Sequence, residues 1–285
     1  MRLQVFTSAN LNYYSQCAAL AESVRLHEPE AHLVLVLVND DPTDIRAKIL
    51  LHLYDEIVTT RELLGHRHDD WMSKYSVVEA CTSVKGRALR KLLDRNTPVI
   101  YLDPDTYLFG SLDRFRSALN DCSILLTPHQ VSTSVDAGMG IPDELDSLLF
   151  GIYNLGMLGA RPTKQGKDFA RWWDARLENH CLDDKNHGLF TDQKWINLVP
   201  HLFSETDVFT DPSVNLASWN LHNRNLTLSS DGTYLVDGHP LVLYHFTKIQ
   251  SVGMGVSSQK ILQNPLAADL VRYYLERLEY WAFGP

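Results

Sequence analysis

An uninterrupted apolar segment, residues 33–38, constrains the fold of this chain more than any other feature. Alternating Leu and Val without a polar position are typical of a strand that is covered on both faces, and such strands belong to parallel sheets. Helical periodicity precedes this segment at residues 13–25 and follows it at 43–53, and short apolar strands are predicted at 3–6 and 56–59. The N-terminal part of the chain therefore predicts a β-α-β-α-β unit of an open α/β sheet.

Later segments extend this pattern toward the C-terminus. Helical periodicity covers residues 71–95, and the next strand, residues 98–102, leads directly into acidic residues. Further strands are predicted at 124–126, 152–158 and 241–246, and further helices at 169–177 and 265–281. We therefore expect an α/β fold with a single Rossmann-like mixed sheet, flanked by helices and followed by a C-terminal helix.

Charge and hydropathy limit the classes of partner. The chain has 26 Lys and Arg against 35 Asp and Glu, a formal net charge of −9, which argues against a nucleic-acid partner. No stretch approaches about 18 consecutive apolar residues, and residues 1–14 lack the charged start and long apolar run of a secretory signal. We therefore expect a cytoplasmic protein without a transmembrane segment. The amphipathic C-terminal helix leaves peripheral contact with a membrane as an alternative to docking on the protein itself.

Two carboxylates follow the strand that ends at Leu102. Asp103 and Asp105 lie at the carboxyl end of a strand, where open α/β sheets bind their ligands. Residues two apart in an extended segment point the same way, so both can offer hard oxygen ligands to Mg²⁺ or Mn²⁺. Such a metal would neutralise a departing diphosphate. Most isolated Asp-x-Asp pairs are solvated turns or caps, but the buried strand before this pair favours a functional site.

Four segments in a fixed order resemble one enzyme family. Residues 74–112, which contain the acid pair, are similar to the nucleotide-sugar region of GT-A fold glycosyltransferases, above all glycosyltransferase family 8 and related bacterial enzymes. The other three segments are residues 153–159, 191–197 and 244–248. The resemblance implies one GT-A domain over residues 1–285. It would comprise a nucleotide-binding half (1–112), a donor-sugar and acceptor half (113–262) and the C-terminal helix (263–285).

The resemblance implies that Mn²⁺ or Mg²⁺ is held by Asp103, Asp105 and His245. A neutral imidazole suits Mn²⁺, and a histidine at the end of a late strand can approach a metal loop that is distant in sequence. The alternative for His245 is a core histidine hydrogen-bonded beneath the sheet. A second stretch rich in His and Asp, residues 66–70, has no spacing suited to a fixed metal geometry, and we expect a polar, mobile loop there.

The resemblance also implies which residues bind a nucleotide-sugar donor, with a UDP-sugar favoured. Residues 7–10 are expected as a polar turn beside the base and ribose. The donor-binding residues implied are Thr7, Ser8 and Asn10 at base and ribose, Asp40 at uracil or ribose, Lys85 and Lys248 at phosphates or sugar, and Asn154 and Gly156 at sugar and acceptor. Asn215, Trp219 and Asn220 form a further polar and aromatic cluster that can floor the sugar site.

Each of these assignments has a plain structural alternative. Hydroxyls and amides in loops are common helix caps. Lys85 is equally compatible with a solvated lysine on a helix face. Lys248 lacks the neighbouring Gly and Pro-Trp of the family pattern, which leaves its role open.

Asp192 and Gln193 resemble the pair beneath the anomeric carbon in retaining family members, where such groups steady the transition state or orient the acceptor. In addition, Thr191 is expected to be the N-cap of a helix over residues 194–198. The function expected is transfer of a sugar, with retention of configuration, to a hydroxyl of an unidentified glycan, lipid-linked or protein acceptor. Two alternatives stay open: phosphoryl transfer by the acid pair, and non-catalytic binding of nucleotide or glycan on the same fold.

Overall fold

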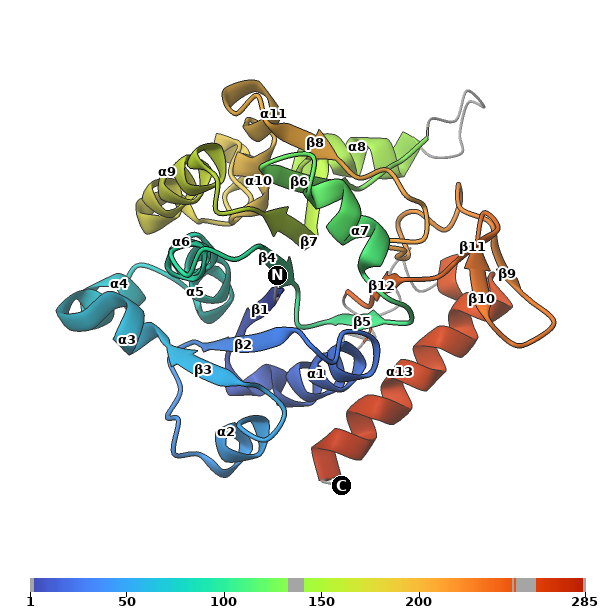
Figure 1. Ribbon diagram of the computed structural model, residues 1–285, viewed down its shortest axis with the longest axis horizontal. Coiled ribbons are helices and arrows are strands. Elements are labelled where there is room, and N and C mark those ends of the chain that lie inside the picture. Colours follow the sequence, from blue (N-terminus) through green and yellow to red (C-terminus); the bar gives the residue numbers. More distant parts are fainter. Residues whose placement is uncertain (1–2, 133–140, 248, 250–259, 284–285) are drawn as a thin grey trace.

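A seven-stranded mixed sheet forms the centre of the computed structural model, which describes residues 3–132, 141–247, 249 and 260–283 (Figure 1). The strand order is β3-β2-β1-β4-β7-β6-β8, with β3, β2, β1 and β4 mutually parallel and β7 antiparallel to both of its neighbours. The strands are β1 (Gln4–Ala9), β2 (His32–Leu37), β3 (Glu56–Thr59), β4 (Val99–Leu102), β6 (Ile124–Pro128), β7 (Tyr153–Ala160) and β8 (Thr206–Val208). The predicted Rossmann-like mixed sheet is confirmed.

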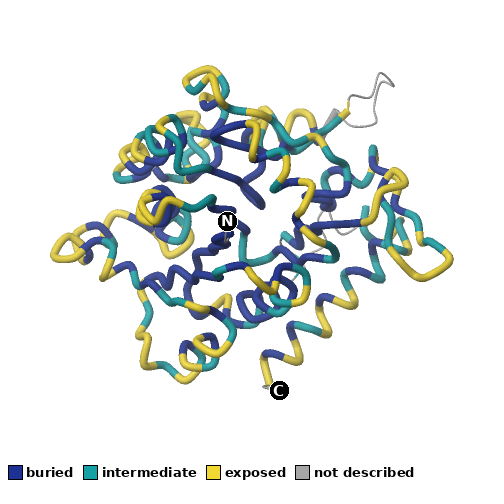
Figure 2. Tube along the Cα trace, viewed as in Figure 1, coloured by how far each residue is buried: buried dark blue, intermediate teal, exposed yellow. Residues whose placement is uncertain are grey.

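Two hydrophobic cores lie on opposite faces of this sheet, and Figure 2 shows the buried residues concentrated along its strands. Along β2, Leu33, Leu35 and Leu37 enter one core, while Val34 and Val36 enter the other. This alternation explains why β2 has no polar position, because each of its faces is covered.

Helices supply the other side of each core. The Leu33 side is covered by α1 (Tyr14–His27), α2 (Ile45–Leu50), α7 (Asp113–Leu119) and α13 (Pro265–Phe283). The Val34 side is covered by α3 (Thr60–Leu64), α4 (His68–Met72), α5 (Val77–Ser83), α6 (Lys85–Leu93), α9 (Lys164–His180), α10 (Gln193–Ile196) and α11 (Val199–Leu202). The remaining α-helix among the described residues is α8 (Ile141–Phe150), and short 3-10 turns occur at Leu11–Tyr13, Gly65–Arg67 and Lys185–His187.

The strand predicted at residues 241–246 is present over Leu243–His245, but it is not part of the central sheet. Strand β12 (Leu243–His245) pairs with β5 (Thr106–Leu108) in an antiparallel ribbon that places His245 opposite Thr106. A separate three-stranded sheet consists of β9 (Leu226–Leu228), β10 (Tyr234–Val236) and β11 (His239–Pro240). Because β5 follows the acid pair directly, its pairing with β12 carries His245 to the carboxyl end of β4.

Two local predictions were wrong, and a third was right only in part. Residues 7–9 were expected in a turn, but β1 continues through them because each of them pairs in parallel with a residue of β2. The helical stretch at 71–95 is divided among α4, α5 and α6, with Ser76 as a capping residue at the start of α5. Residues 66–70 form a 3-10 turn and the start of α4 rather than a loop. There His68 is buried, with its Nε2 3.1 Å from the hydroxyl oxygen of Thr60.

The C-terminal helix docks on the body of the protein, as one of the two alternatives predicted. On α13, Arg277 and Trp281 donate hydrogen bonds to Glu22 of α1, at 2.7 and 2.9 Å. The ring of Tyr274 stacks on that of Phe246, with centroids 4.0 Å apart and planes at 6°. The helix therefore supports the segment that follows His245. None of the helices in the described ranges has the length and hydropathy needed to cross a membrane.

Candidate active site

Asp103, Asp105 and His245 form one cluster at the carboxyl end of β4. Their ligand atoms all lie within 4.8 Å of one another. The Nε2 atom of His245 is 3.0 Å from Asp105 Oδ1 and 3.7 Å from Asp103 Oδ2. The two carboxylates are partly exposed and the imidazole is buried, so the cluster opens to solvent on its carboxylate side. Two carboxylate oxygens and one imidazole nitrogen are a donor set that can hold a divalent metal ion.

Buried amides fix the orientation of His245. The N–H of Gly156 donates to Asn154 Oδ1 at 2.8 Å, which sets the direction of that amide. Asn215 Nδ2 donates to the same oxygen, so Asn215 Oδ1 faces His245 Nδ1 at 3.2 Å, beside Asn154 Oδ1 at 3.1 Å. Two acceptors at Nδ1 require a proton there. The lone pair of the neutral imidazole therefore lies on Nε2, which points toward Asp103 and Asp105.

The negative charges of Asp103 and Asp105 also act on the imidazole of His245. Burial alone lowers the pKa of His245, but the charges of Asp105 and Asp103 outweigh it and raise that pKa above its ordinary value. Burial raises the pKa of Asp105, and the opposing effects of His245 and Thr247 bring it below its ordinary value. The site therefore favours a positive charge at Nε2, whether a proton or a metal ion supplies it.

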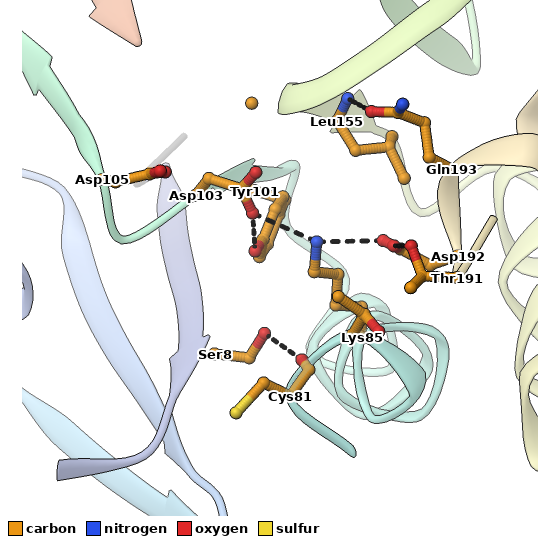
Figure 3. Close-up of polar contacts among 12 residues, drawn as sticks. Ser8, Cys81, Lys85, Tyr101, Asp103, Asp105, Leu155, Thr191, Asp192 and Gln193 are labelled. Carbon is orange, nitrogen blue, oxygen red and sulfur yellow. Dashed lines mark hydrogen bonds and ion pairs between the residues drawn. The ribbon is translucent and has the colours of Figure 1, made fainter. Parts of the chain in front are cut away.

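Lys85 connects the acid pair to Asp192, the carboxylate predicted to lie beneath the anomeric carbon (Figure 3). Its Nζ is 3.1 Å from Asp103 Oδ1 and 2.9 Å from Asp192 Oδ2, and it lies 4.3 Å from the centroid of the Tyr101 ring. Lys85 is only 2% exposed, so the alternative of a solvated lysine is wrong. Burial alone lowers the pKa of Lys85, but Asp103 and Asp192 raise it well above its ordinary value. Lys85 is therefore a buried cation shared by two acids.

Asp192, rather than Thr191, is the N-cap residue of α10, and its side chain makes no capping hydrogen bond. The carboxylate instead accepts a hydrogen bond from the Thr191 hydroxyl at 3.1 Å and pairs with Lys85. Thr191 has a φ of 45°, an unfavourable conformation for a β-branched residue. Burial raises the pKa of Asp192. The Asp192 carboxylate thus pairs with Lys85 instead of capping α10, and the N-cap predicted at Thr191 is wrong.

Gln193 braces a bulge in β7. Its Oε1 accepts from the N–H of Leu155 at 3.1 Å, as drawn in Figure 3, and its Nε2 donates to Phe150 O at 3.2 Å. The register of β6 and β7 shifts between Leu126 and Thr127, and the Thr127 hydroxyl lies 2.9 Å from Asn154 O. Bulges of this kind re-aim side chains beside active sites. Here the bulge directs Asn154 toward His245.

The proposed nucleotide-loop residues lie at the ends of β1 and β2, on the same sheet edge as the acid pair. Thr7 is fully buried, and the Ser8 hydroxyl donates to Cys81 O at 2.7 Å. The side chain of Asn10 makes no capping bond, and Asp40 Oδ2 accepts from the N–H of Leu11. Lys248 lies outside the residues that the structure describes.

The polar and aromatic cluster at 215–220 supports His245. Asn215 and Asn220 are fully buried, and Asn220 donates to Asn215 O at 3.0 Å. The Trp219 ring meets the His245 ring edge to face, with centroids 5.2 Å apart. The residues at 215–220 therefore support the imidazole of His245.

Two residues near the cluster were missed in the sequence. Tyr13 is 39% exposed, and its pKa is raised by burial and by the negative charge of Asp105. His129 Nε2 lies 3.1 Å from Asn154 Nδ2 and must accept from it, and burial lowers the pKa of His129 to about 4. The position of Tyr13, an aromatic residue shortly after the first strand, could have indicated a role at the nucleotide site. Nothing in the sequence pattern distinguishes His129.

A comparison with protein families identifies the chain. The profile of the nucleotide-diphospho-sugar transferases matches residues 34–211, more than half of its length. The chain belongs to this family. The protein is therefore a glycosyltransferase that takes a nucleotide-sugar donor, and the phosphoryl-transfer alternative is set aside.

This nucleotide-diphospho-sugar transferase is similar to a curated relative and to solved structures. It is 27% identical to YfnF, an uncharacterised protein of Bacillus subtilis, over 256 residues that cover 86% of this chain and 80% of YfnF. The galactosyltransferase LgtC, solved with donor and acceptor sugar analogs, superposes with a TM-score of 0.53 at 15% identity, covering 94% of this chain and 95% of LgtC. That likeness shows a shared GT-A fold. GlyE of Streptococcus pneumoniae has a TM-score of 0.46 at 19% identity over 76% of this chain, which spans 47% of GlyE.

Replacing Gly156 of the transferase with alanine is expected to disrupt the cluster. A Cβ at this position would lie 2.4 Å from His245 Nδ1, so the imidazole must move. The Cβ would also lie 2.7 Å from Asn215 Oδ1 and 2.8 Å from Asn154 Oδ1. We expect a loss of about 1–3 kcal/mol in the free energy of unfolding, as for an overpacked core, together with weaker Mn²⁺ binding. Urea unfolding and Mn²⁺ titration measure the two effects.

Gly159→Ala is the matched control, because it lies on the same strand and its Cβ would meet Phe115 at 2.8 Å instead. This variant is expected to lose stability but to keep its affinity for Mn²⁺. If the two variants bound Mn²⁺ equally well, Gly156 would have no specific role at the cluster.

Proposed function

We propose that this glycosyltransferase moves a sugar from a UDP-sugar to an acceptor hydroxyl, with Mn²⁺ or Mg²⁺ held by Asp103, Asp105 and His245, in the manner of glycosyltransferase family 8. The observation that carries the proposal is the fixed tautomer of His245. Two amide oxygens hold a proton on Nδ1, and the lone pair on Nε2 is directed at both carboxylates. Histidines that bind a metal typically donate their other ring N–H to a fixed oxygen acceptor in this way.

The residues of the cluster divide the chemistry among them. When bound, a divalent cation offsets the negative charge that develops on the departing diphosphate. Asp103 presents Oδ2 to the cluster, because Lys85 and the hydroxyl of Tyr101 both contact Oδ1. Thr247 donates to Asp105 Oδ2 at 3.1 Å and so orients the second carboxylate. We propose that Asn154 and Gly156 orient His245. The sugar and the acceptor would then bind on the solvent-exposed side of the bulge in β7.

The nucleotide is proposed to bind along the ends of β1 and β2. The partly exposed ring of Tyr13 offers a face on which a base can stack. The side chain of Asn10 makes no capping hydrogen bond and so keeps hydrogen-bonding capacity for a ligand, whereas the Thr7 hydroxyl is fully buried and has no partner among the described residues. Asp40 has one oxygen engaged by the N–H of Leu11, which leaves the other for a ribose or base. The Ser8 hydroxyl is already engaged, and it can only accept from a ligand.

We propose retention of configuration. An inverting enzyme needs a carboxylate free to take the proton of the acceptor hydroxyl. The candidate, Asp192, is paired with Lys85 at 2.9 Å, and the Gln193 amide is engaged by Leu155 and Phe150. Asp192 in this pair is suited to stabilising positive charge at the anomeric carbon while the acceptor attacks from the side of the leaving group.

Thermal unfolding with a panel of nucleotides tests the proposal without knowledge of the acceptor. UDP, GDP, CMP and ADP are compared with and without Mn²⁺. We expect UDP to stabilise the protein only when Mn²⁺ is present, by about 2.7 kcal/mol at a ligand concentration one hundred times its Kd. Stabilisation by another nucleotide would reassign the base. If no nucleotide had an effect, the proposed donor site would be wrong. Release of free sugar from the matching UDP-sugar then separates a catalyst from a binding protein.

A further inference from the structure

One buried cation serves two acids that belong to different parts of the proposed site. Lys85 Nζ lies between Asp103 Oδ1, at 3.1 Å, and Asp192 Oδ2, at 2.9 Å. Figure 3 shows it reaching from α6 to the end of β4 on one side and to the start of α10 on the other. Asp103 belongs to the metal cluster, whereas Asp192 belongs to the proposed sugar site. The side chains of Lys85 and Asp192 are each only 3% exposed, so solvent screens their charges little.

The two oxygens of Asp103 have different neighbours. Oδ1 faces inward and is contacted by Lys85 and by the Tyr101 hydroxyl, while Oδ2 faces His245. Positive charge at Oδ1 withdraws negative charge from the carboxylate that a metal would meet at Oδ2. The more strongly Lys85 interacts with Asp103, the weaker a metal ligand Asp103 becomes. Asp192 competes for the same ammonium group and so counteracts this weakening.

From this arrangement we infer that Lys85 couples metal binding at Asp103 to Asp192, so that each strengthens the other. This inference rests on the proposed metal site. A metal bound at Oδ2 neutralises the charge of Asp103. The ammonium group of Lys85 then interacts mainly with Asp192. Because coupling between two sites is reciprocal, an ionised Asp192 must raise the affinity for metal by the same factor. Lys85 acts here as a positioning residue, which fixes the acid of the sugar site when the metal is bound.

Titration of Mn²⁺ into the protein tests this inference without any measurement of activity. Asp192→Asn keeps the shape of the side chain but releases Lys85 to Asp103. We expect it to weaken Mn²⁺ binding by about three- to tenfold, the range typical of contacting charged residues. Lys85→Met/Asp192→Asn removes both charges and leaves no unpaired buried ion at this position. This double variant is expected to bind Mn²⁺ at least as tightly as the unmodified protein.

Asp174→Asn is the matched control. Asp174 is a buried acid that pairs with Arg87 and Arg90 of the same helix, α6, and makes no ion pair with the metal cluster. Its substitution should leave the affinity for Mn²⁺ unchanged. The inference is overturned if Asp192→Asn binds Mn²⁺ like the unmodified protein, or if the double variant stays as weak as Asp192→Asn.

Failure of the proposed function gives a different result. In that case the unmodified protein binds no Mn²⁺, or Asp103→Ala binds it as well as the unmodified protein does. Circular dichroism of each variant confirms that it is folded.

Discussion

Alanine substitutions at Asp103, Asp105 and His245 are each expected to abolish most Mn²⁺-dependent cleavage of the donor. Each residue supplies one of the three ligand atoms that lie within 4.8 Å of one another. A metal contributes several kcal/mol to stabilising the leaving charge, and about 1.4 kcal/mol corresponds to a factor of ten in rate. We therefore expect a reduction of about a hundredfold to a thousandfold, together with loss of Mn²⁺-dependent nucleotide binding. Calorimetric titration and release of UDP from the donor measure these effects.

His66→Ala is the control for these substitutions, because His66 is an exposed histidine on the 3-10 turn Gly65–Arg67. It should leave both quantities nearly unchanged. His68 is a poorer control than its sequence suggests, since it is buried against Thr60 and its loss would affect folding. Equal losses in His66→Ala and in the three cluster variants would contradict the metal assignment.

Lys85→Met is expected to have the largest effect on stability. The substitution removes the cation shared by Asp103 and Asp192 and leaves the buried carboxylate of Asp192 without its ion pair. Breaking a buried pair by removing one partner costs about 3–5 kcal/mol in the free energy of unfolding. Urea unfolding at pH 7 measures this loss.

The pH dependence of that loss identifies its cause. Burial raises the pKa of Asp192 and Lys85 opposes the shift, so without Lys85 the folded-state pKa rises further above the unfolded value of about 3.9. Stability from a raised carboxyl pKa is fully present below the unfolded value and is lost as pH rises through the folded value. The deficit of Lys85→Met should therefore be smallest near pH 4 and grow toward pH 7. Adding Asp192→Asn should remove this pH dependence, and a deficit independent of pH would assign the loss to packing instead.

The sequence predicted the elements that depend on local pattern. The apolar run in β2 and the strand before Asp103 both occur where expected, because a strand buried on both faces leaves no polar position in the sequence. The position of Asp103 and Asp105 could be predicted from the buried strand that precedes them. A carboxylate directly after a buried strand can only lie at the edge of the sheet where ligands bind.

Features that depend on tertiary pairing could not be predicted in this way. Lys85 begins a helix with polar and apolar faces, and only the packing of α6 against the end of β4 shows that its side chain is buried. The N-cap of α10 is Asp192 rather than Thr191, and its carboxylate makes no capping bond because it pairs with Lys85. The proton on His245 Nδ1 depends on Asn154, whose orientation is set by a bulge that no sequence rule indicates.

The stacking of Tyr274 on Phe246 has a consequence for the synthesis of the protein. Phe246 follows His245 directly, and its ring rests on a helix that begins only at Pro265. A nascent chain that has reached residue 260 already contains all three proposed metal ligands but lacks the helix on which the residue after the third ligand rests. Because a ribosome adds residues in order, we expect metal loading to follow the emergence of α13. Unfinished chains would then neither withdraw metal from the cell nor consume nucleotide sugar.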